Sequence, residues 1–425
     1  MSDIIINKSN YEIVVIGMGY VGLTYSLHLN TFGYSVLGIE TDQKTKDAIN
    51  NRVLPFYEEG IEGRLNNFVK QGLLRVESPE DFASKKSVVP KIYIVTVGTP
   101  VELNKINKTS LNKVFEFLNT NTSSGDAIVL RSTVPIGLTR NYCESINANI
   151  NYCFAPERTI EGKATFELAT LPQIFGSNDI ISKVFFKEFF GLVSSEVFEV
   201  SKSESAELVK LTSNVYRDVT FGFSNEISLI SYKNDINSKE VIDACNYKYP
   251  RCNIFSSGPV AGPCLSKDAY ILSESIDQAH TISLILSSRK LNENYILDIL
   301  RKLIKGVRSV SILGLSFKGT PPTNDIRDSY ALTLIDFLRS ESMEVSSYDP
   351  LVFDEDFKLL KLKRDNTLED AFFRKDLIII QNNNEIFKRM NINKLSSLMN
   401  KNSVILDLWS LHKDVEINNS KYIGI

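Results

Sequence analysis

A short β-branched run that ends directly in closely spaced glycines is the feature that most restricts how this chain can fold. The run is residues 13–16, and the glycines follow as G-x-G-x-x-G in Gly17, Met18, Gly19, Tyr20, Val21 and Gly22. A helix-like stretch continues to about Phe32, and a second strand-like run covers residues 35–39. In such a unit the first glycine permits the tight turn and the third lets helix and strand pack closely. The second lets a pyrophosphate approach the helix N-terminus, so the segment predicts a dinucleotide site.

The second strand-like run ends at a carboxylate, Glu40, 18 residues beyond Gly22. A carboxylate at this position accepts hydrogen bonds from ribose hydroxyls and repels a 2′-phosphate, which favours NAD over NADP. The alternative is a structural glycine turn followed by a surface glutamate. Two further pairs each follow a strand-like run, and as strand ends of a doubly wound sheet they are either cofactor contacts or ordinary turns. They are Gly98 with Thr99, and Ser132 with Thr133.

Strand and helix signals alternate in two separate parts of the chain. In the first part, the apolar runs 92–97 and 127–130 are typical of buried strands in a parallel sheet covered on both faces. The alternation restarts near residue 307, with runs at 309–315, 344–348, 376–380 and 403–406. Between the two parts, apolar residues recur every three to four positions over 203–232, which predicts one long helix. Such a helix either spans domains, forms a dimer contact or is a plain core helix.

These patterns predict an α/β protein with two Rossmann-like doubly wound lobes joined by a helical middle domain with a long central helix. The expected domains are 1–199, which binds NAD, 200–305, which is helical and carries the cysteine loop described below, and 306–425, a second α/β lobe. A chain of 425 residues is long enough for two or three domains.

Composition excludes several classes of protein. The net charge of −3 gives no global reason to bind nucleic acid or an anionic membrane, and no apolar run approaches the roughly 18 residues needed to cross a bilayer. The first residues do not form a secretory signal. Five dispersed cysteines, with neither CxxC nor HExxH spacing, argue against a disulfide framework or a metal site. A reducing cytoplasm is therefore expected.

Cys264 lies in a segment rich in glycine and proline, residues 258–268. The composition before it predicts a tight, irregular loop, and Lys267 and Asp268 follow within four residues. A nearby cation lowers the pKa of a thiol from about 8.5, and the thiolate is the nucleophile. The segment therefore predicts a reactive cysteine, with a buried inert one as the alternative.

Lys210 and Asn214 are spaced i, i+4 on the expected long helix, so they share one face. Together they can hold a hydroxyl, a carbonyl oxygen or a water. A solvated polar face is the alternative interpretation.

Taken together and in order, these motifs resemble those of the UDP-sugar and GDP-mannose 6-dehydrogenases over essentially the whole chain. The matching features are GxGxxG, Gly98-Thr99-Pro100, the STVP of residues 132–135, Pro156-Glu157, Lys210-x-x-x-Asn214, Cys264-x-x-Lys267-Asp268, Leu315-Ser316-Phe317-Lys318 and the DIRDS of residues 325–329. The cysteine loop with the Phe-Lys segment is specific to that family, whereas Lys-x-x-x-Asn also occurs in hydroxyacid dehydrogenases.

The resemblance implies a four-electron oxidation of a sugar C6 alcohol to a carboxylate with two NAD. Asp268, with Asn214 and an ordered water, is implied as the base, and Cys264 as the nucleophile that forms a thiohemiacetal and then a thioester. Lys210 would stabilise oxyanions, while Glu157 would help to activate the hydrolytic water and Thr133 would position it. Substrate contacts are implied for Glu157, Arg158, Glu161, Lys210, Asn214, Arg251, Gly262 and Lys318, with Arg251 acting across a subunit boundary of a homodimer or higher homo-oligomer. Lys267 and Arg327 are implied as cofactor contacts.

The chain departs from the family pattern in two places. Pro259 and Ala261 occupy positions that are usually glycine, and alanine is strained there if φ is positive. After Pro156-Glu157, the segment 158–163 resembles the N-acetylhexosamine branch, which oxidises UDP-N-acetylmannosamine or UDP-N-acetylglucosamine. Arg158 is then expected to bind the acetamido carbonyl or a phosphate, or to form a structural salt bridge.

Three rivals to a UDP-N-acetylhexosamine 6-dehydrogenase for surface polysaccharide synthesis stay open at this point. One is a UDP-glucose 6-dehydrogenase. A two-electron hydroxyacid dehydrogenase shares the first lobe but has no use for Cys264 or a second lobe. A non-catalytic protein that binds sugar nucleotides and NAD would have no need of the cysteine, lysine, asparagine and aspartate.

Overall fold

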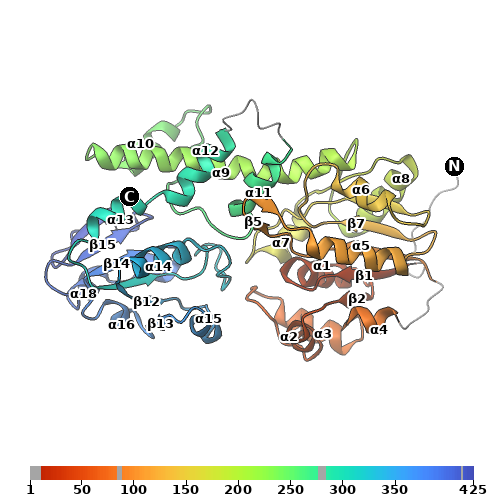
Figure 1. The fold of residues 1–425 in the computed structure, drawn as a ribbon, viewed down its shortest axis with the longest axis horizontal. Coiled ribbons are helices and arrows are strands. Elements are labelled where there is room, and N and C mark those ends of the chain that lie inside the picture. Colours follow the sequence, from red (N-terminus) through yellow and green to blue (C-terminus); the bar gives the residue numbers. More distant parts are fainter. Residues whose placement is uncertain (1–10, 84–88, 276–283, 413–414) are drawn as a thin grey trace. The chain divides into compact units, whose positions relative to one another are not determined.

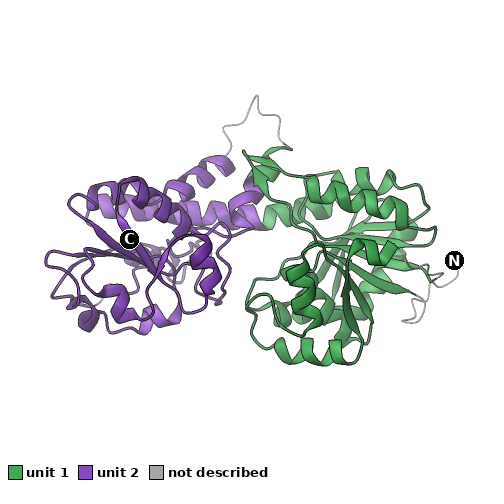
Figure 2. Ribbon diagram, turned by 60° about the horizontal axis from the view of Figure 1, so that its bottom comes forward, with its two compact units in different colours: residues 1–213, 270–277 green, residues 214–269, 278–425 purple. Residues whose placement is uncertain are grey.

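The computed structural model describes residues 11–83, 89–275, 284–412 and 415–425. The chain divides into two compact units, coloured in Figure 2: residues 1–213 with 270–277, and residues 214–269 with 278–425. Each unit contains one mainly parallel sheet flanked by helices (Figure 1). The predicted fold class, two doubly wound α/β lobes with a helical region between them in the sequence, is confirmed.

The sheet of unit 1 has eight strands in the spatial order β10-β9-β8-β7-β4-β1-β2-β3. Their bounds are β1 Glu12–Ile16, β2 Val36–Ile39, β3 Leu74–Glu77, β4 Lys91–Val95, β7 Ala127–Leu130, β8 Asn151–Phe154, β9 Gln173–Gly176 and β10 Val197–Val200. The helices are α1 Tyr20–Thr31, α2 Gln43–Asn50, α3 Glu62–Lys70, α4 Pro79–Ala83, α5 Thr109–Asn121, α6 Leu138–Glu144, α7 Ala164–Thr170 and α8 Ile180–Val193. A short hairpin, β5 Val101–Glu102 and β6 Lys105–Ile106, follows β4.

Strand β1 shows why the apolar runs form this sheet. Ile13 and Val15 join the apolar core on one face, whereas Val14 and Ile16 join the core on the other. A strand that buries side chains on both faces has to be apolar throughout. One departure from the predicted parallel sheet is β9, which pairs with β8 in antiparallel fashion and with β10 in parallel.

The sheet of unit 2 has the order β13-β12-β11-β14-β15-β16, and all its pairs are parallel. The strands are β11 Ser309–Leu313, β12 Glu344–Tyr348, β13 Lys363–Arg364, β14 Leu377–Ile380, β15 Val404–Asp407 and β16 Lys421–Gly424. In chain order both sheets therefore contain the arrangement 3-2-1-4-5-6, which is the strand order of dinucleotide-binding folds. The helices are α10 Ser238–Asn246, α12 Leu284–Asn294, α13 Leu297–Leu303, α14 Tyr330–Ser340, α15 Asp354–Leu359, α16 Leu368–Phe372, α17 Glu385–Arg389 and α18 Ile392–Ser396.

The long helix is α9, Ser203–Lys233, drawn in yellow-green in Figure 1. It agrees with the predicted 203–232 to within one residue and contributes residues to both units. Helix α11, Leu265–Ser273, directly follows Cys264. Within the described part of the chain, every helix is too short or too polar to span a bilayer.

Candidate active site

The glycine loop between β1 and α1 has the geometry that a dinucleotide phosphate requires. Gly17 has φ +92°, and a Cβ on it would lie 3.0 Å from a Val97 methyl group. A Cβ on Gly22 would lie 1.9 Å from the Gly17 carbonyl oxygen, so only glycine lets α1 approach β1 this closely. A Cβ on Gly19 would point into open space. Gly19 is also the N-cap of α1, with neither a capping side chain nor an acidic residue in the first turn, so the helix N-terminus presents its N–H groups to an anion.

Glu40 lies at the end of β2, beside the glycine loop. Its carboxylate accepts N–H groups from Met18 at 2.7 Å, Thr41 at 2.8 Å and Asp42 at 2.9 Å. These bonds hold the carboxylate against the loop, where the sequence predicts contact with the ribose.

Tyr20, in the glycine loop, connects α1 to a distant segment. Its hydroxyl donates to the Glu58 carboxylate, which also accepts the N–H groups of Gly162 at 2.6 Å and Ala164 at 2.9 Å. Glu58 is buried. The segment that contains Glu161 is therefore fixed to the start of α1 through a residue that the sequence analysis did not identify.

The two predicted pairs after β4 and β7 lie together. The Thr99 hydroxyl donates to the Thr133 carbonyl oxygen at 2.8 Å, and the Ser132 hydroxyl donates to the Val97 carbonyl oxygen at 2.7 Å. Glu207 of α9 accepts N–H groups from Gly137 and Thr139, which holds the start of α6, shortly after the STVP residues, against α9.

Glu157 is a buried carboxylate in an ion pair. One oxygen lies 2.6 Å from Nη2 of Arg131, whose side chain is 1% exposed, and the other accepts the N–H groups of Arg158 and Thr159. Burial raises the pKa of Glu157, but Arg131 and these N–H groups outweigh it and hold the pKa below its usual value. Glu157 is therefore ionised at neutral pH and is a weak base.

Lys210 of α9 lies next to this ion pair. Its Nζ donates to the Glu157 backbone carbonyl oxygen at 2.6 Å, and the side chain is buried. Arg158 donates from Nη2 to the Pro172 carbonyl oxygen at 2.7 Å, so one edge of its guanidinium has a structural partner. The alternative interpretation of a solvated face does not hold at Lys210, since the side chain is buried and its ammonium has the hydrogen-bond acceptor that burial requires.

In unit 2, the cysteine loop packs against two aromatic rings. A Cβ on Gly262 would lie 2.5 Å from the Phe317 ring, and one on Gly258 would lie 2.7 Å from the Trp409 ring. Within residues 258–264, Gly262 alone has positive φ, +96°. Ala261 is therefore unstrained where the family more often has glycine.

Cys264 is exposed and directly precedes α11. Its carbonyl oxygen accepts the N–H of Asp268 at 3.1 Å, and this bond places Asp268 in the first turn of α11. Asn214 of α9 donates to the buried Asp268 carboxylate at 2.6 Å. The structure thus joins the predicted base to its predicted asparagine, and the N-terminus of α11 adjoins the predicted nucleophile.

The remaining predicted residues of unit 2 are basic. Lys267 lies in the first turn of α11. The Lys318 ammonium lies 5.3 Å from the Phe317 ring centroid, and Arg327 binds the Asp325 carboxylate through Nε and Nη2. Arg251 donates from Nε to the Tyr249 hydroxyl at 2.9 Å.

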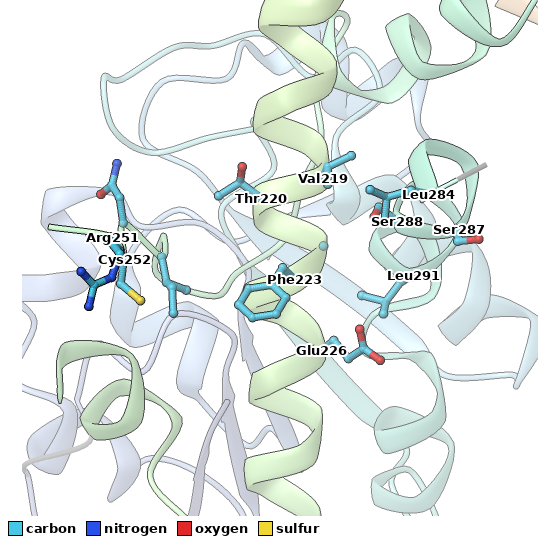
Figure 3. Close-up of a pocket in the computed structure, with 13 residues that line it drawn as sticks. Val219, Thr220, Phe223, Glu226, Arg251, Cys252, Leu284, Ser287, Ser288 and Leu291 are labelled. Atoms are coloured by element: carbon cyan, nitrogen blue, oxygen red, sulfur yellow. The ribbon is translucent and has the colours of Figure 1, made fainter. Parts of the chain in front are cut away.

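Arg251 also lines a cavity of about 650 Å³ beside α9, with Phe223 and Leu291 (Figure 3). The lining is mainly apolar. In Figure 3 Arg251 and Cys252 approach from one side of α9, and Leu284, Ser288 and Leu291 of α12 from the other.

Sequence reasoning did not identify the buried charged partners of these residues. Arg131 and Glu157 are 26 positions apart, and Asp218 and Arg289, a second buried ion pair, are 71 apart. The available signal for Arg131 is a charge directly after an apolar strand, which suggests a partner at the strand end.

Comparison with known proteins agrees with this geometry. Family models of the UDP-glucose/GDP-mannose dehydrogenases match the NAD binding domain at residues 11–192, the central domain at 204–294 and the UDP binding domain at 311–414. The UDP-N-acetyl-D-mannosamine dehydrogenase of Methanococcus aeolicus is 29% identical, with 94% of this chain and 91% of the relative covered.

Solved structures give the same result. The structure of the UDP-D-ManNAc dehydrogenase from Pyrococcus horikoshii superposes with a TM-score of 0.87 at 26% identity, covering 97% of this chain and 99% of that one. The UDP-N-acetyl-mannosamine dehydrogenase of Staphylococcus aureus gives 0.82 at 25% identity, covering 97% and 98%. This chain belongs to the UDP-glucose/GDP-mannose dehydrogenase family and is an NAD-dependent nucleotide-sugar dehydrogenase.

Proposed function

We propose that this enzyme oxidises C6 of a UDP-N-acetylhexosamine, UDP-N-acetylmannosamine before UDP-N-acetylglucosamine, to the uronate. The observation that carries the proposal is the joined Asn214–Asp268 pair one turn beyond an exposed Cys264. The preference for an acetamido sugar rests on the segment 158–163 and on relatives named UDP-N-acetyl-D-mannosamine dehydrogenases. We further propose a cytoplasmic reaction whose product is used for capsule or other surface polysaccharides.

The first oxidation requires a base at the C6 hydroxyl. NAD, when bound, accepts a hydride from C6 in each of two oxidations. We assign the hydroxyl proton to Asp268, through a water held with Asn214, and stabilisation of the oxygen to the Lys210 ammonium. An alcohol thereby becomes an aldehyde with release of one proton.

The second oxidation is assigned to the Cys264 thiolate. Its sulfur adds to the aldehyde carbon to give a thiohemiacetal, and loss of a second hydride leaves a thioester. Water then breaks the C–S bond, which releases the carboxylate and restores the thiol. In sum, one alcohol, two NAD⁺ and one water give one carboxylate, two NADH and three protons.

The surroundings of Glu157 in the structure favour a role other than the activation of water that the resemblance implies. Both of its oxygens already accept hydrogen bonds and its pKa is held low, so it is poorly suited to take a proton from water. We assign it to the orientation of Lys210 through its backbone carbonyl oxygen. Thr133 keeps its proposed part in positioning the water.

The NADH yield from a limiting nucleotide sugar tests the proposal. With excess NAD, UDP-N-acetylmannosamine is expected to give about two NADH per sugar, because the aldehyde stays on Cys264 until the second oxidation. UDP-N-acetylglucosamine and UDP-glucose run beside it identify the sugar. About one NADH per sugar would contradict the thioester, and two on UDP-glucose alone would contradict the acetamido assignment.

We also propose a homodimer formed through α9. Tyr216, Phe223 and Ile230 are spaced by seven residues on this helix and are 59%, 50% and 51% exposed. A seven-residue apolar repeat is the pattern of a helix that packs on another helix. Phe223 also lines the mainly apolar cavity beside α9. Arg251, for which the resemblance implies action across a subunit boundary, lines the same cavity.

Replacing Phe223 by aspartate is expected to convert the dimer to a monomer. The new charge would be desolvated at the centre of the interface, which costs several kcal/mol. Light scattering after size exclusion measures the mass, and Glu226→Gln, three residues along the same helix, is the control. A dimer in the Phe223→Asp variant would place the subunit contact elsewhere.

A further inference from the structure

One face of α9 holds the cysteine loop at successive points. Asn214, Asp218 and Asn225 are separated by four and seven residues, so they project from the same side of the helix. Asn214 binds the Asp268 carboxylate after the loop. Asn225 binds the backbone at the start of the loop, donating to the Gly258 carbonyl oxygen at 3.0 Å and accepting its N–H at 2.8 Å.

Asp218, between these two, acts through Arg289 of α12. The Arg289 Nη1 lies 2.7 Å from the Asp218 carboxylate, and the two side chains are 2% and 1% exposed. The same guanidinium donates to the Leu265 carbonyl oxygen at 3.1 Å from Nη1 and to the Val260 carbonyl oxygen at 3.3 Å from Nη2. One planar group therefore holds both ends of the six-residue stretch that contains Cys264.

The pair is completed by Asn292, one turn beyond Arg289 on α12. Its amide donates to the Asp218 carboxylate and backbone carbonyl oxygen, both at 2.9 Å, and its oxygen accepts a hydrogen bond from Asn225. A buried ion pair of this kind gives little net stability compared with apolar residues of similar volume. What the network adds is geometry, because a guanidinium has five donors in a fixed plane and a lysine has a single point charge.

We propose that Arg289 is a positioning residue that sets the reactivity of Cys264, by fixing the carbonyl oxygens of Val260 and Leu265 at the two ends of the reactive stretch. Asp218 neutralises its charge, and Asn292 and Asn225 connect it to the loop start. The inference rests on the proposed thioester chemistry, because the Cys264 sulfur must be aligned with the aldehyde carbon, and a misplacement of about 1 Å can cost about 100-fold in rate.

Arg289→Lys tests the proposal, with two readouts. The kcat for NADH formation is expected to fall about 100-fold, the cost of a displacement near 1 Å, while KM for the nucleotide sugar changes less than about threefold. The alkylation rate of the Cys264 peptide by iodoacetamide, followed by mass spectrometry across pH, is expected to change at least about fivefold relative to Cys245, an exposed cysteine on α10 in the same sample.

Arg301→Lys is the matched control, because Arg301 is exposed on α13 and pairs with Asp298 at the surface. If Arg289→Lys does not fold, the double variant Asp218→Asn, Arg289→Met is used instead. It removes both charges of the ion pair and the Arg289 hydrogen bonds to Val260 and Leu265, and it leaves no unpaired buried charge. Normal kcat with normal Cys264 alkylation in the folded variant would overturn the proposal. So would a loss of activity that only follows the folded fraction, with Cys264 alkylation unchanged. Failure of the wild type to oxidise any nucleotide sugar would refute the proposed function instead, and the alkylation comparison would still decide on Arg289.

Discussion

Cys264→Ser is expected to abolish uronate formation and to leave both ligands bound. The serine hydroxyl is a weak nucleophile without an adjacent base, whereas a thiol is already partly ionised at neutral pH, so complete turnover should fall on the order of 1,000-fold or more. Cys264 is exposed and directly precedes α11, and serine differs from cysteine in one atom, so the fold should be retained. NADH yield and product mass measure turnover, and calorimetry measures binding of the nucleotide sugar.

Cys245→Ser is the control for this experiment, since Cys245 is the other exposed cysteine and lies on α10. It should retain wild-type turnover. Two NADH per sugar at the wild-type rate in Cys264→Ser would mean that no covalent capture takes place. Loss of nucleotide-sugar binding in that variant would instead show that the thiol has a binding role.

Arg131→Met is expected to lower the free energy of unfolding of unit 1 by about 3–5 kcal/mol at pH 7, because it leaves the Glu157 carboxylate charged and buried. Activity should fall as well, since the Glu157 backbone holds Lys210. Urea denaturation measures the first effect and NADH formation the second. Arg140→Met is the control, because Arg140 pairs with Glu204 at the surface, where such a pair contributes about 0–1 kcal/mol.

The same variant has a characteristic dependence on pH. In the wild type the pKa of Glu157 is lowered on folding, so its stabilisation is present above the unfolded-state value of about 4.3 and is lost as the pH falls through the folded-state value. Without Arg131 burial raises the folded-state pKa, so the cost grows as the pH rises past about 4.3. The stability difference between wild type and variant should therefore widen from pH 4 to pH 7. A difference independent of pH would show that Glu157 is not the affected group.

Regular, long patterns were the ones that the sequence predicted well. Helix α9 repeats its apolar spacing over eight turns, so its ends were located to within one residue. The central strands, such as β14, are buried on both faces and therefore apolar at every position. Edge strands are different: β13 consists of Lys363 and Arg364 alone, and its existence depends on pairing with β12 rather than on its own residues.

Some residues of the candidate site were predicted from the sequence, and others were not. Residues inside short motifs, such as Asn214 and Asp268, were predicted, and the structure joins them at 2.6 Å. Arg131 and Arg289 were missed because burial of a charge is decided by its partner, and that partner is 26 or 71 residues away. A charge directly after an apolar strand, as at Arg131, suggests that a partner exists, but nothing local in the sequence identifies which residue it is.

The packing of Gly258 against Trp409 makes the protein its own optical probe. The chain has one tryptophan, so all indole emission comes from the ring that a Cβ on Gly258 would meet at 2.7 Å. Its Nε1 donates to the Gln381 carbonyl oxygen at 2.8 Å, which fixes the ring in one orientation. Excitation at the red edge of the absorption band selects this indole over the 17 tyrosines. The emission wavelength and the fluorescence lifetime of Trp409 should therefore report on the surroundings of Gly258, at the start of the cysteine loop, during turnover and without a label.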